Sequence, residues 1–408
     1  MKGWTNKTIG ELCDEGGGKV KTGPFGSQLH QSDYQDEGIP VVMPTNISEG
    51  KIDVTRIARV SESHVDRLHK HKLSKGDIVY GRRGDIGRQA LVRSENVGWL
   101  CGTGCLRISL GKPQISPEFL HLYLSLPRIA EWVENQAVGS TMANLNTGIL
   151  RRVPVWYPTN IKEQQKIFNI VFAYDDLIEN NKRRIALLEK MAEEIYREWF
   201  VRLRFPGHEK VKVVKGVPEG WVEKRFGAFC VLQRGHDLPD SKVVPGPYPV
   251  AASTSIKTYH NQFKAKPPIV TTGRSGSLGT VLFINEKTWP LNTCLYVKDF
   301  CGNSCYLVYY TLKNMGLENF NAGAGVPTLN RNHLNGIPLV VPPQTLQDRF
   351  DAVIAPIFNQ QEALLKQNSN LTQTRNSLLP RLISGKLSVE NLDIQFPPGM
   401  GGNILSEP

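Results

Sequence analysis

Two cysteine pairs are the residues whose type and spacing come nearest to a known chemistry. Cys101 and Cys105 in CGTGC, and Cys301 and Cys305 in CGNSC, are each separated by three residues, a gap that occurs between zinc ligands. The two pairs occupy different places in the internal repeat described below, so they do not form a duplicated motif. We therefore expect buried structural thiols rather than a metal site.

A histidine group and two glycine-lysine pairs are the next candidates for chemistry. His64, His69 and His71 lie close together in HVDRLHKHK, which we interpret as an exposed helix or loop. The glycine-lysine pairs in GGGKVKTG and ISGKLS do not have the spacing of a phosphate-binding loop. The sequence also lacks a Gly-x-Ser-x-Gly elbow, a His-Glu-x-x-His helix, a dinucleotide fingerprint and the Asn-Pro-Pro-aromatic loop of an adenine methyltransferase. We therefore expect neither a catalytic site nor a bound metal in this chain alone.

The chain is basic and has an ordinary globular composition. It has 408 residues, of which 40% are hydrophobic, and its formal net charge is +11. This excess favours a polyanionic partner such as nucleic acid, and a basic protein without such a partner is the alternative. The sequence contains no run of about 18 apolar residues and no apolar targeting core after MKGWTNKTIGEL. We therefore expect a cytoplasmic protein that does not enter a membrane and keeps its cysteines reduced.

A long internal repeat organises the sequence. LNTGILRRVPVWYP, residues 145–158, is matched 184 positions later by LNRNHLNGIPLVVP. The correspondence continues in the same order, with GWTNKTIGELC matching GWVEKRFGAFC, IPVVMPTNI matching YPVAASTSI, and GDIVYGRRGDIG matching PPIVTTGRSGSLG. The same alignment places Cys105 opposite Cys294. A common order with variable spacing is what duplicated domains with loops of different length should show.

Each half alternates short β-branched and aromatic runs with glycine and proline, which predicts mostly strands and turns. A helix is expected over 116–136 in the first half and a weaker one over 304–317 in the second. Each half is followed by a run typical of one long helix, whose apolar residues recur at alternating steps of three and four, as in a coiled-coil seam. The predicted seam residues are Ile178, Asn181, Ile185, Leu188, Ala192, Ile195 and Trp199 in the first run, and Ile354, Ile357, Gln361, Leu364, Asn368, Leu371, Arg375, Leu378 and Leu382 in the second.

Polar residues inside both seams predict that the two helices pair. We expect an antiparallel pair with Asn181 opposite Gln361, Asn368 or Arg375, because a buried polar group chiefly fixes register; the alternative is that each helix packs on its own domain. Pro356 should kink or start the second helix. The predicted fold class is α/β (α+β), with two similar target-binding domains separated by two long antiparallel coiled-coil helices. The predicted segments are residues 1–158 as the first domain, 159–205 as the central helix, 206–342 as the second domain with a linker over 205–220, and 343–408 as the C-terminal helix and tail.

The loops of both halves place glycines beside arginine, amide and hydroxyl side chains. Glycine lets the backbone approach phosphate, and arginine and amide groups form paired hydrogen bonds with base edges. A structural turn is an equally good interpretation of any single position, but the bias recurs at matching places in the two halves. The candidate nucleic-acid contacts are Ser27, Gln28, His30, Arg82, Arg83, Arg88, Asn144 and Asn146 in the first half, and Gln233, Arg234, His236, Arg274, Ser275, Asn330 and Arg331 in the second.

With these motifs in this order, the sequence resembles the DNA-specificity subunits of Type I restriction-modification systems. The resemblance is carried by TGPFGSQL, IPVVMPTNI, GDIVYGRRGDIG, GSTMANLN and EQQKI in the first half, and by GVPTLN, IPLVVPP and LLPRLISGKL in the second. It implies a noncatalytic subunit whose two target-recognition domains each read one half of a split, asymmetric DNA site, with the long helices setting the gap. It also implies double-stranded DNA, two methyltransferase subunits and restriction subunits as partners. S-adenosylmethionine, ATP and Mg would belong to those partner subunits, with no cofactor bound by this chain.

The two halves also differ. Ala252 and Ser253 stand where the first half has Met43 and Pro44, so the two halves should read different bases. Changing Arg83 to alanine should then alter the specificity of one half-site only. A protein-interaction scaffold with incidental positive charge is the alternative function, and a fused methyltransferase or nuclease is disfavoured by the missing motifs.

Overall fold

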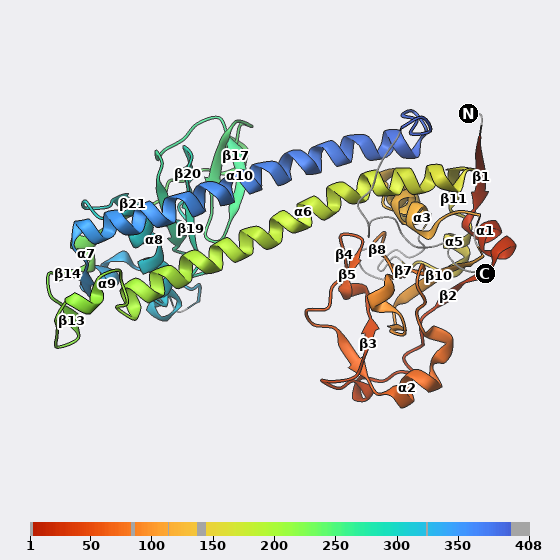
Figure 1. Cartoon of the computed structure of the whole chain (residues 1–408), viewed down its shortest axis with the longest axis horizontal. Coiled ribbons are helices and arrows are strands. Elements are labelled where there is room, and N and C mark those ends of the chain that lie inside the picture. Colours follow the sequence, from red (N-terminus) through yellow and green to blue (C-terminus); the bar gives the residue numbers. More distant parts are fainter. Residues whose placement is uncertain (1–2, 83–85, 113, 137–143, 324, 393–408) are drawn as a thin grey trace. The chain divides into compact units, whose positions relative to one another are not determined.

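The computed structural model describes residues 3–82, 86–112, 114–136, 144–323 and 325–392. The chain forms two compact units, the first made of residues 1–179 and 368–408 and the second of residues 180–367. Each of the two long helices drawn in Figure 1 has residues in both units. The units therefore divide the chain differently from the four predicted segments, because each unit contains part of both helices.

The first unit is built from small, mostly antiparallel sheets. Its central sheet has four strands in the order β2-β10-β7-β8. These strands are β2 (Gly17–Thr22), β10 (Cys105–Gly111), β7 (Ile78–Gly81) and β8 (Gln89–Leu91). A second sheet contains β6 (Ala58–Val60), β3 (Ile39–Val42) and β9 (Leu100–Cys101), with β3 and β9 parallel. Two short antiparallel pairs complete the unit: β1 (Trp4–Thr8) with β11 (Pro154–Pro158), and β4 (Ile47–Ser48) with β5 (Lys51–Ile52).

The second unit repeats this strand order. Its central sheet runs β15-β21-β18-β19, formed by β15 (Val231–Arg234), β21 (Cys294–Asp299), β18 (Ile269–Gly273) and β19 (Val281–Ile284). The three-stranded sheet contains β17 (Ile256–His260), β16 (Tyr248–Ala251) and β20 (Trp289–Pro290), again with one parallel pair. The strands β14 (Val222–Arg225) and β22 (Pro338–Val341) form an antiparallel pair equivalent to β1 with β11. The predicted repeat is confirmed, and Cys105 and Cys294 begin equivalent strands.

Short helices cover the sheets where the sequence predicted them. The first unit has α3 (Pro117–Leu124) and α4 (Pro127–Gln136), and the second has α8 (Cys305–Asn314). One continuous helix was expected over 116–136, and the structure instead breaks it before Pro127. Proline lacks the N–H that an interior helical position needs, and it disfavours helical backbone at the residue before it.

A buried glutamine holds the same junction together in each unit. Gln164 accepts from the Ser116 backbone N–H at 2.7 Å and donates to the Pro158 carbonyl at 2.7 Å. Gln347 accepts from the Ser304 N–H at 2.8 Å and donates to the Pro342 carbonyl at 3.0 Å. Each glutamine thus joins the start of a long helix to the last strand of its domain and to the N-terminus of α3 or α8. Buried backbone groups need hydrogen-bond partners. The glutamine amides provide partners for backbone groups that form no hydrogen bond within a sheet or a helix.

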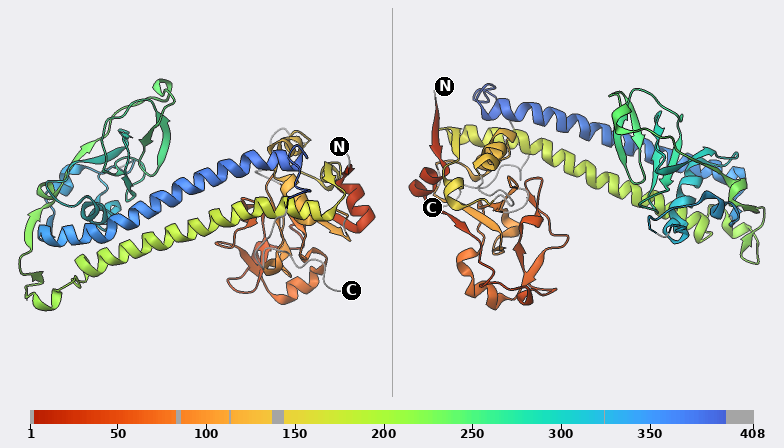
Figure 2. Two further views of the ribbon diagram at one scale, coloured as in Figure 1. Left: turned by 45° about the horizontal axis from the view of Figure 1, so that its top comes forward. Right: turned by 180° about the vertical axis from the view of Figure 1, so that it is seen from behind.

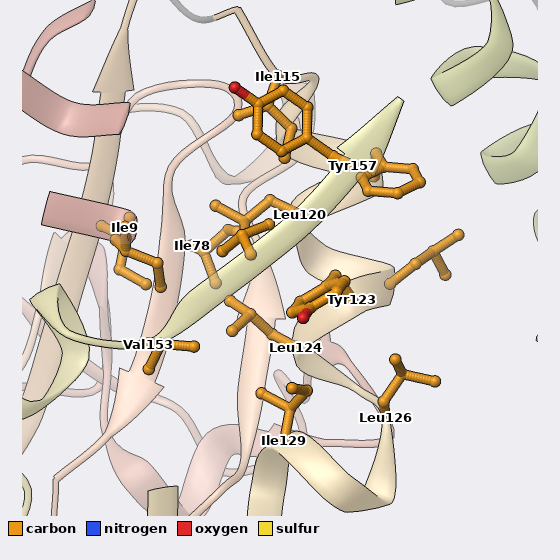
Figure 3. Close-up of a cluster of buried hydrophobic side chains, with 14 of the residues drawn as sticks. Ile9, Ile78, Ile115, Leu120, Tyr123, Leu124, Leu126, Ile129, Val153 and Tyr157 are labelled. Carbon is orange, nitrogen blue, oxygen red and sulfur yellow. The ribbon is translucent and has the colours of Figure 1, made fainter. Parts of the chain in front are cut away.

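The hydrophobic core of the first unit surrounds strand β11. Figure 3 shows Ile9, Ile78, Leu120, Leu124 and Val153 gathered around this strand, and all five side chains are fully buried. They come from α1 (Ile9–Gly16), β7, α3 and the segment entering β11. Burying one such side chain contributes about 1.5–3 kcal/mol, so this cluster fixes the sheets and short helices that carry the loops.

The long helices are α6 (Ile161–Tyr196), which continues as a π-helical turn over Arg197–Val201, and α10 (Gln344–Ile383). In the first unit, Asp175 pairs with Arg375, and Asn368 Nδ2 donates to the Ile178 carbonyl at 3.4 Å. In the second unit, Asn181 Nδ2 donates to Gln367 Oε1 at 3.1 Å. In the first unit the partner on α10 falls from Arg375 to Asn368 as the residue on α6 rises from Asp175 to Ile178. In the second it falls from Gln367 to Phe350, whose ring centroid lies 6.4 Å from that of Tyr196. The predicted antiparallel pairing is therefore confirmed within each unit. Figure 2 shows the two helices side by side within each unit in further views.

The predicted seam residues are the buried or half-buried positions of these helices, and most residues between them are exposed. Two details differ from expectation. Asn181 donates to Gln367, one position before the seam residue Asn368, because a long amide side chain can reach across the edge of the seam. Pro356 does not start α10, which begins at Gln344 and continues through Pro356. The predicted linker over 205–220 contains a short hairpin of β12 (Val213–Val214) and β13 (Val217–Pro218).

Within the part of the chain that the structure describes, no helix combines the length and the apolar character required to cross a membrane.

Candidate nucleic-acid interface

The second unit contains an open groove lined by several of the candidate nucleic-acid contacts. Its volume is about 630 Å³. Strand β15, the loop that follows it, strand β21 and the start of α9 (Arg331–Asn335) form its walls. The lining residues are Val231, Leu232, Gln233, Arg234, Gly235, His236, Asp237, Lys298 and Arg331. The structure thus brings together four predicted residues from two loops that lie far apart in the sequence.

Neighbouring groups orient the arginines of this groove. Arg331 Nη1 donates to the Leu232 carbonyl at 3.2 Å. Asn330, just before it, caps α9 by accepting from the Asn332 backbone N–H at 3.0 Å. Arg234 Nη2 lies 3.8 Å from a carboxylate oxygen of Asp237. Such an exposed ion pair contributes little to stability. The other N–H groups of the Arg234 guanidinium can still donate to a ligand.

His236 lines the groove and packs against aromatic rings. Its ring lies 6.3 Å from that of Trp289 and 6.1 Å from that of Tyr296, measured between centroids. Burial lowers the pKa of His236, and the nearby Lys264 ammonium lowers it further. The imidazole is therefore held mainly neutral, as a hydrogen-bonding group rather than a cation.

Asn292 connects the groove to the loop that follows β18. Its side chain donates to Asp237, and its carbonyl accepts from Arg274 Nη1 at 3.4 Å. Backbone hydrogen bonds then hold this loop against the segment before α9: Gly276 N donates to Pro327 O at 2.9 Å, and Leu329 N donates to Arg274 O at 2.8 Å. Ser275 also forms a bridge with Thr328. The predicted residues Arg274, Ser275, Asn330 and Arg331 thus lie on adjoining segments of one surface.

The equivalent surface of the first unit is partly described. Arg82, at the end of β7, donates from Nε to Asn144 Oδ1 at 3.0 Å, and Leu145 N donates to Arg82 O at 3.0 Å. The loop after β7 and the segment before α5 (Thr147–Arg151) are therefore adjacent, as in the second unit. Arg83 lies outside the described residues.

Other candidates in the first unit have local structural partners or are exposed. The side chain of Gln28 accepts from the Phe25 backbone N–H at 3.1 Å, within its own turn. Asn146 caps α5 by accepting from the Ile149 N–H at 2.9 Å. Ser27, His30 and Arg88 are exposed. Gln28 and Asn146 thus have a structural role within their own loops.

Lys298 is a groove residue that the sequence did not single out. It lies in β21, in the run CLYVKD, where the pattern indicates only a strand that becomes polar at its end. No loop motif marks Lys298, because its place in the groove depends on how β21 pairs with β15. Its charge at the end of an otherwise apolar strand is the one signal that could have drawn attention to it.

The cysteines and histidines noted at the outset lie in structural positions. Burial raises the pKa of the Cys101 thiol to about 12 and raises that of Cys105 well above its usual value, whereas zinc binds thiolates. Cys305 is half-buried, but Cys301 is exposed, contrary to expectation. Cys301 lies in the turn after β21, where its backbone N–H donates to Asp299 Oδ1 at 2.8 Å. Nowhere in the described ranges do three or more potential ligands form a group that could hold a metal ion.

The histidines of HVDRLHKHK each lie within hydrogen-bond distance of another group of the chain. His64 lies in α2 (Glu62–Arg67), where its Nδ1 is 2.6 Å from Ser61 Oγ. His69 and His71 lie in the following helical turn, and His71 Nδ1 is 3.1 Å from the Thr22 carbonyl. His69 is exposed, while His64 and His71 are half-buried.

Comparison with known proteins shows which proteins this chain is similar to. Residues 1–190 match the family model described as the Type I restriction modification DNA specificity domain. The chain is 25% identical over 424 aligned positions to the Type I restriction enzyme MjaIX specificity subunit of Methanocaldococcus jannaschii, an alignment that covers 96% of this chain and 95% of the relative. It is also 28% identical over 176 positions to the Type I restriction enzyme EcoBI specificity subunit of Escherichia coli, covering 40% of this chain and 37% of the relative.

A solved structure shares the fold. The crystal structure of the S subunit of a Type I restriction-modification system from M. genitalium superposes with a TM-score of 0.63 at 19% identity, covering 93% of this chain and 96% of that one. This chain therefore shares its fold with that S subunit. Residues 1–190 thus match the specificity-domain model, and the chain is similar over nearly its whole length to a Type I restriction enzyme specificity subunit.

Proposed function

We propose that this chain is the DNA sequence-recognition subunit of a Type I restriction-modification complex and reads a bipartite, asymmetric site. The observation that carries the proposal is the doubled strand order, β2-β10-β7-β8 in one unit and β15-β21-β18-β19 in the other, with matching loops of different composition. Two similar scaffolds with unlike loops are suited to reading two unlike half-sites. Arginine and amide groups beside glycine turns have the chemistry to contact phosphates and base edges.

The loops after the equivalent strands β3 and β16 are built differently. In the first unit, Asn46 Oδ1 accepts from the Met43 N–H at 3.0 Å. In the second, Ser253 Oγ lies 2.9 Å from the Ser275 carbonyl and 2.8 Å from the Thr293 carbonyl, and its single hydroxyl proton is shared between them. Ser253 thereby ties the loop after β16 to the loop that carries Arg274. Because different hydrogen bonds hold these two loops, the loops present different side chains. This difference supports the proposal that the two units read different target sequences.

The long helices would set the gap between the half-sites and bind two methyltransferase subunits. Helices α6 and α10 contain 36 and 40 residues, and a straight helix rises about 1.5 Å per residue. On α6, Leu187 and Met191 are 66% and 48% exposed and lie one turn apart, which is typical of a surface that a partner covers. S-adenosylmethionine would be bound by the methyltransferase subunits, and ATP and Mg by restriction subunits. The chain itself would be noncatalytic.

Methylation mapping tests this function. The reconstituted complex is incubated with a DNA library and S-adenosylmethionine, and methylated adenines are located by sequencing. We expect a split site with two unlike halves and a fixed gap. Recognition of one continuous short sequence would refute the two-reader proposal. Methyl transfer by the isolated chain would refute its noncatalytic role.

A salt titration separates a DNA reader from a protein-interaction scaffold. Phosphate contacts release counterions, so DNA affinity should fall steeply as salt rises. A flat or absent response for the isolated chain would favour the scaffold, in which the positive charge has no nucleic-acid partner.

A further inference from the structure

The pairing of β15 with β21 contains an irregularity at the groove. Val231 pairs with Asp299 and Leu232 pairs with Val297, so the register shifts between these two positions. Lys298 is the extra residue, without a Cα partner on β15. A β-bulge of this kind bends the strand locally and redirects side chains, and such bulges are common beside functional sites.

The equivalent strand pair of the first unit is regular. The register of β2 with β10 runs from Thr22 opposite Leu106 to Gly17 opposite Gly111 without a shift. Aligning the strand starts at Cys105 and Cys294 places Ser109 at the position of Lys298, and Ser109 pairs with Lys19 in unbroken register. The bulge and its lysine are therefore features of the second unit that the internal repeat does not predict.

The bulged lysine lines the same groove as Arg234, His236 and Arg331. The two arginines are engaged with groups of the chain, Arg234 with Asp237 and Arg331 with the Leu232 carbonyl. Lys298 is exposed, and its side chain forms no hydrogen bond or ion pair with any residue that the structure describes. Three cationic side chains face one carboxylate in this groove, so the groove is positively charged and Lys298 retains all its donors.

We propose that Lys298, placed by the β-bulge, is a DNA phosphate contact specific to the second unit. The inference rests on the proposed DNA-reading function and adds a residue and a role to it. A lysine ammonium is a compact charge that contacts phosphate without distinguishing bases. Lys298 therefore positions the groove on the DNA backbone, while Gln233 and Arg331 remain available for base edges.

The test compares Lys298→Ala and Lys298→Arg with wild type in the full chain, using fluorescence anisotropy with duplexes of several mixed sequences. Lys298→Ala should weaken binding to all sequences alike. Loss of one phosphate contact should make the plot of log affinity against log salt less steep by about 0.9. The ratio of wild-type to variant affinity should therefore fall about 3.5-fold when the salt concentration rises approximately fourfold. Lys298→Arg keeps the charge and should bind nearly as wild type does.

Lys242→Ala is the matched control, because Lys242 is also exposed, lies in the same unit and is not part of the groove lining. Its salt slope should equal that of wild type. An unchanged slope in Lys298→Ala, an equal loss in both alanine variants, or a loss confined to one base position would overturn the assignment. If wild type itself shows no salt-dependent binding to any duplex, the proposed DNA-reading function fails instead, and the two failures are thereby distinguished.

Discussion

Replacing the buried Gln164 with leucine should destabilise the first unit by about 3 kcal/mol. Gln164 is 0% exposed, and its amide is the hydrogen-bond partner of the Ser116 N–H and the Pro158 carbonyl, each at 2.7 Å. Leucine is similar in volume but has no polar atom, so both backbone groups would be left buried without a partner. Each orphaned group costs about 1–3 kcal/mol, and the added apolar burial offsets about 1–2 kcal/mol of that loss.

Urea unfolding of the full chain, followed by hydrogen exchange of α3 and the start of α6, measures this loss. Gln165→Leu makes the same chemical change at a half-buried neighbour, and its effect should stay within about 0.5 kcal/mol. Gln347→Leu should reproduce the loss in the second unit, where the amide bonds to Ser304 and Pro342. If Gln164→Leu were no more destabilising than Gln165→Leu, the amide would not be what satisfies these backbone groups.

Three further perturbations test other parts of the molecule. Arg331→Ala should change the sequence preference of one half-site in methylation mapping; equal loss at every sequence would mark a phosphate contact instead. Inserting one heptad into each long helix, after Glu179 and after Gln367, keeps the seam in register and lengthens each helix by about 10 Å, so the mapped gap should widen by about three base pairs. An unchanged gap would exclude the helices as its determinant. Burial lowers the pKa of His121 to about 4, whereas the unfolded side chain titrates near about 6.5. The folded state therefore binds fewer protons in this window, and stability of the first unit should fall by up to about 3 kcal/mol as pH drops from about 6.5 to 4. Urea unfolding across this range checks the dependence, and His121→Gln should flatten it.

Much of the fold could be predicted because its signals are periodic and local. The repeated phrases ending in VPVWYP and IPLVVP predicted two similar domains, and the strands β11 and β22 begin at equivalent residues, Pro154 and Pro338. The spacing of Ile178, Ala192 and Leu364 predicted the helix seam, and all three are buried. Both patterns depend on which face of an element is apolar, a property that a sequence records directly.

The candidate site could be predicted only in part. Glycine-rich loops with arginines pointed to Arg234, Arg274 and Arg331, which lie on adjoining segments of the second unit. Sequence reasoning could not tell that Gln28 and Asn146 bond to nearby backbone groups, because the residue types that read bases also cap helices and turns. It also missed Lys298, since nothing in CLYVKD marks a shift of register.

The order of hydrophobic and turn residues along the chain determined the doubled domains, the long helices and the face that each helix buries. These properties depend on residues that are close together in the sequence. They can therefore be predicted without knowledge of distant contacts. Tertiary packing alone decided that Asn181 meets Gln367, that Arg331 reaches Leu232, and that Lys298 bulges from β21 into a groove. Those outcomes depend on the register between segments far apart in the chain, which many side chains set together.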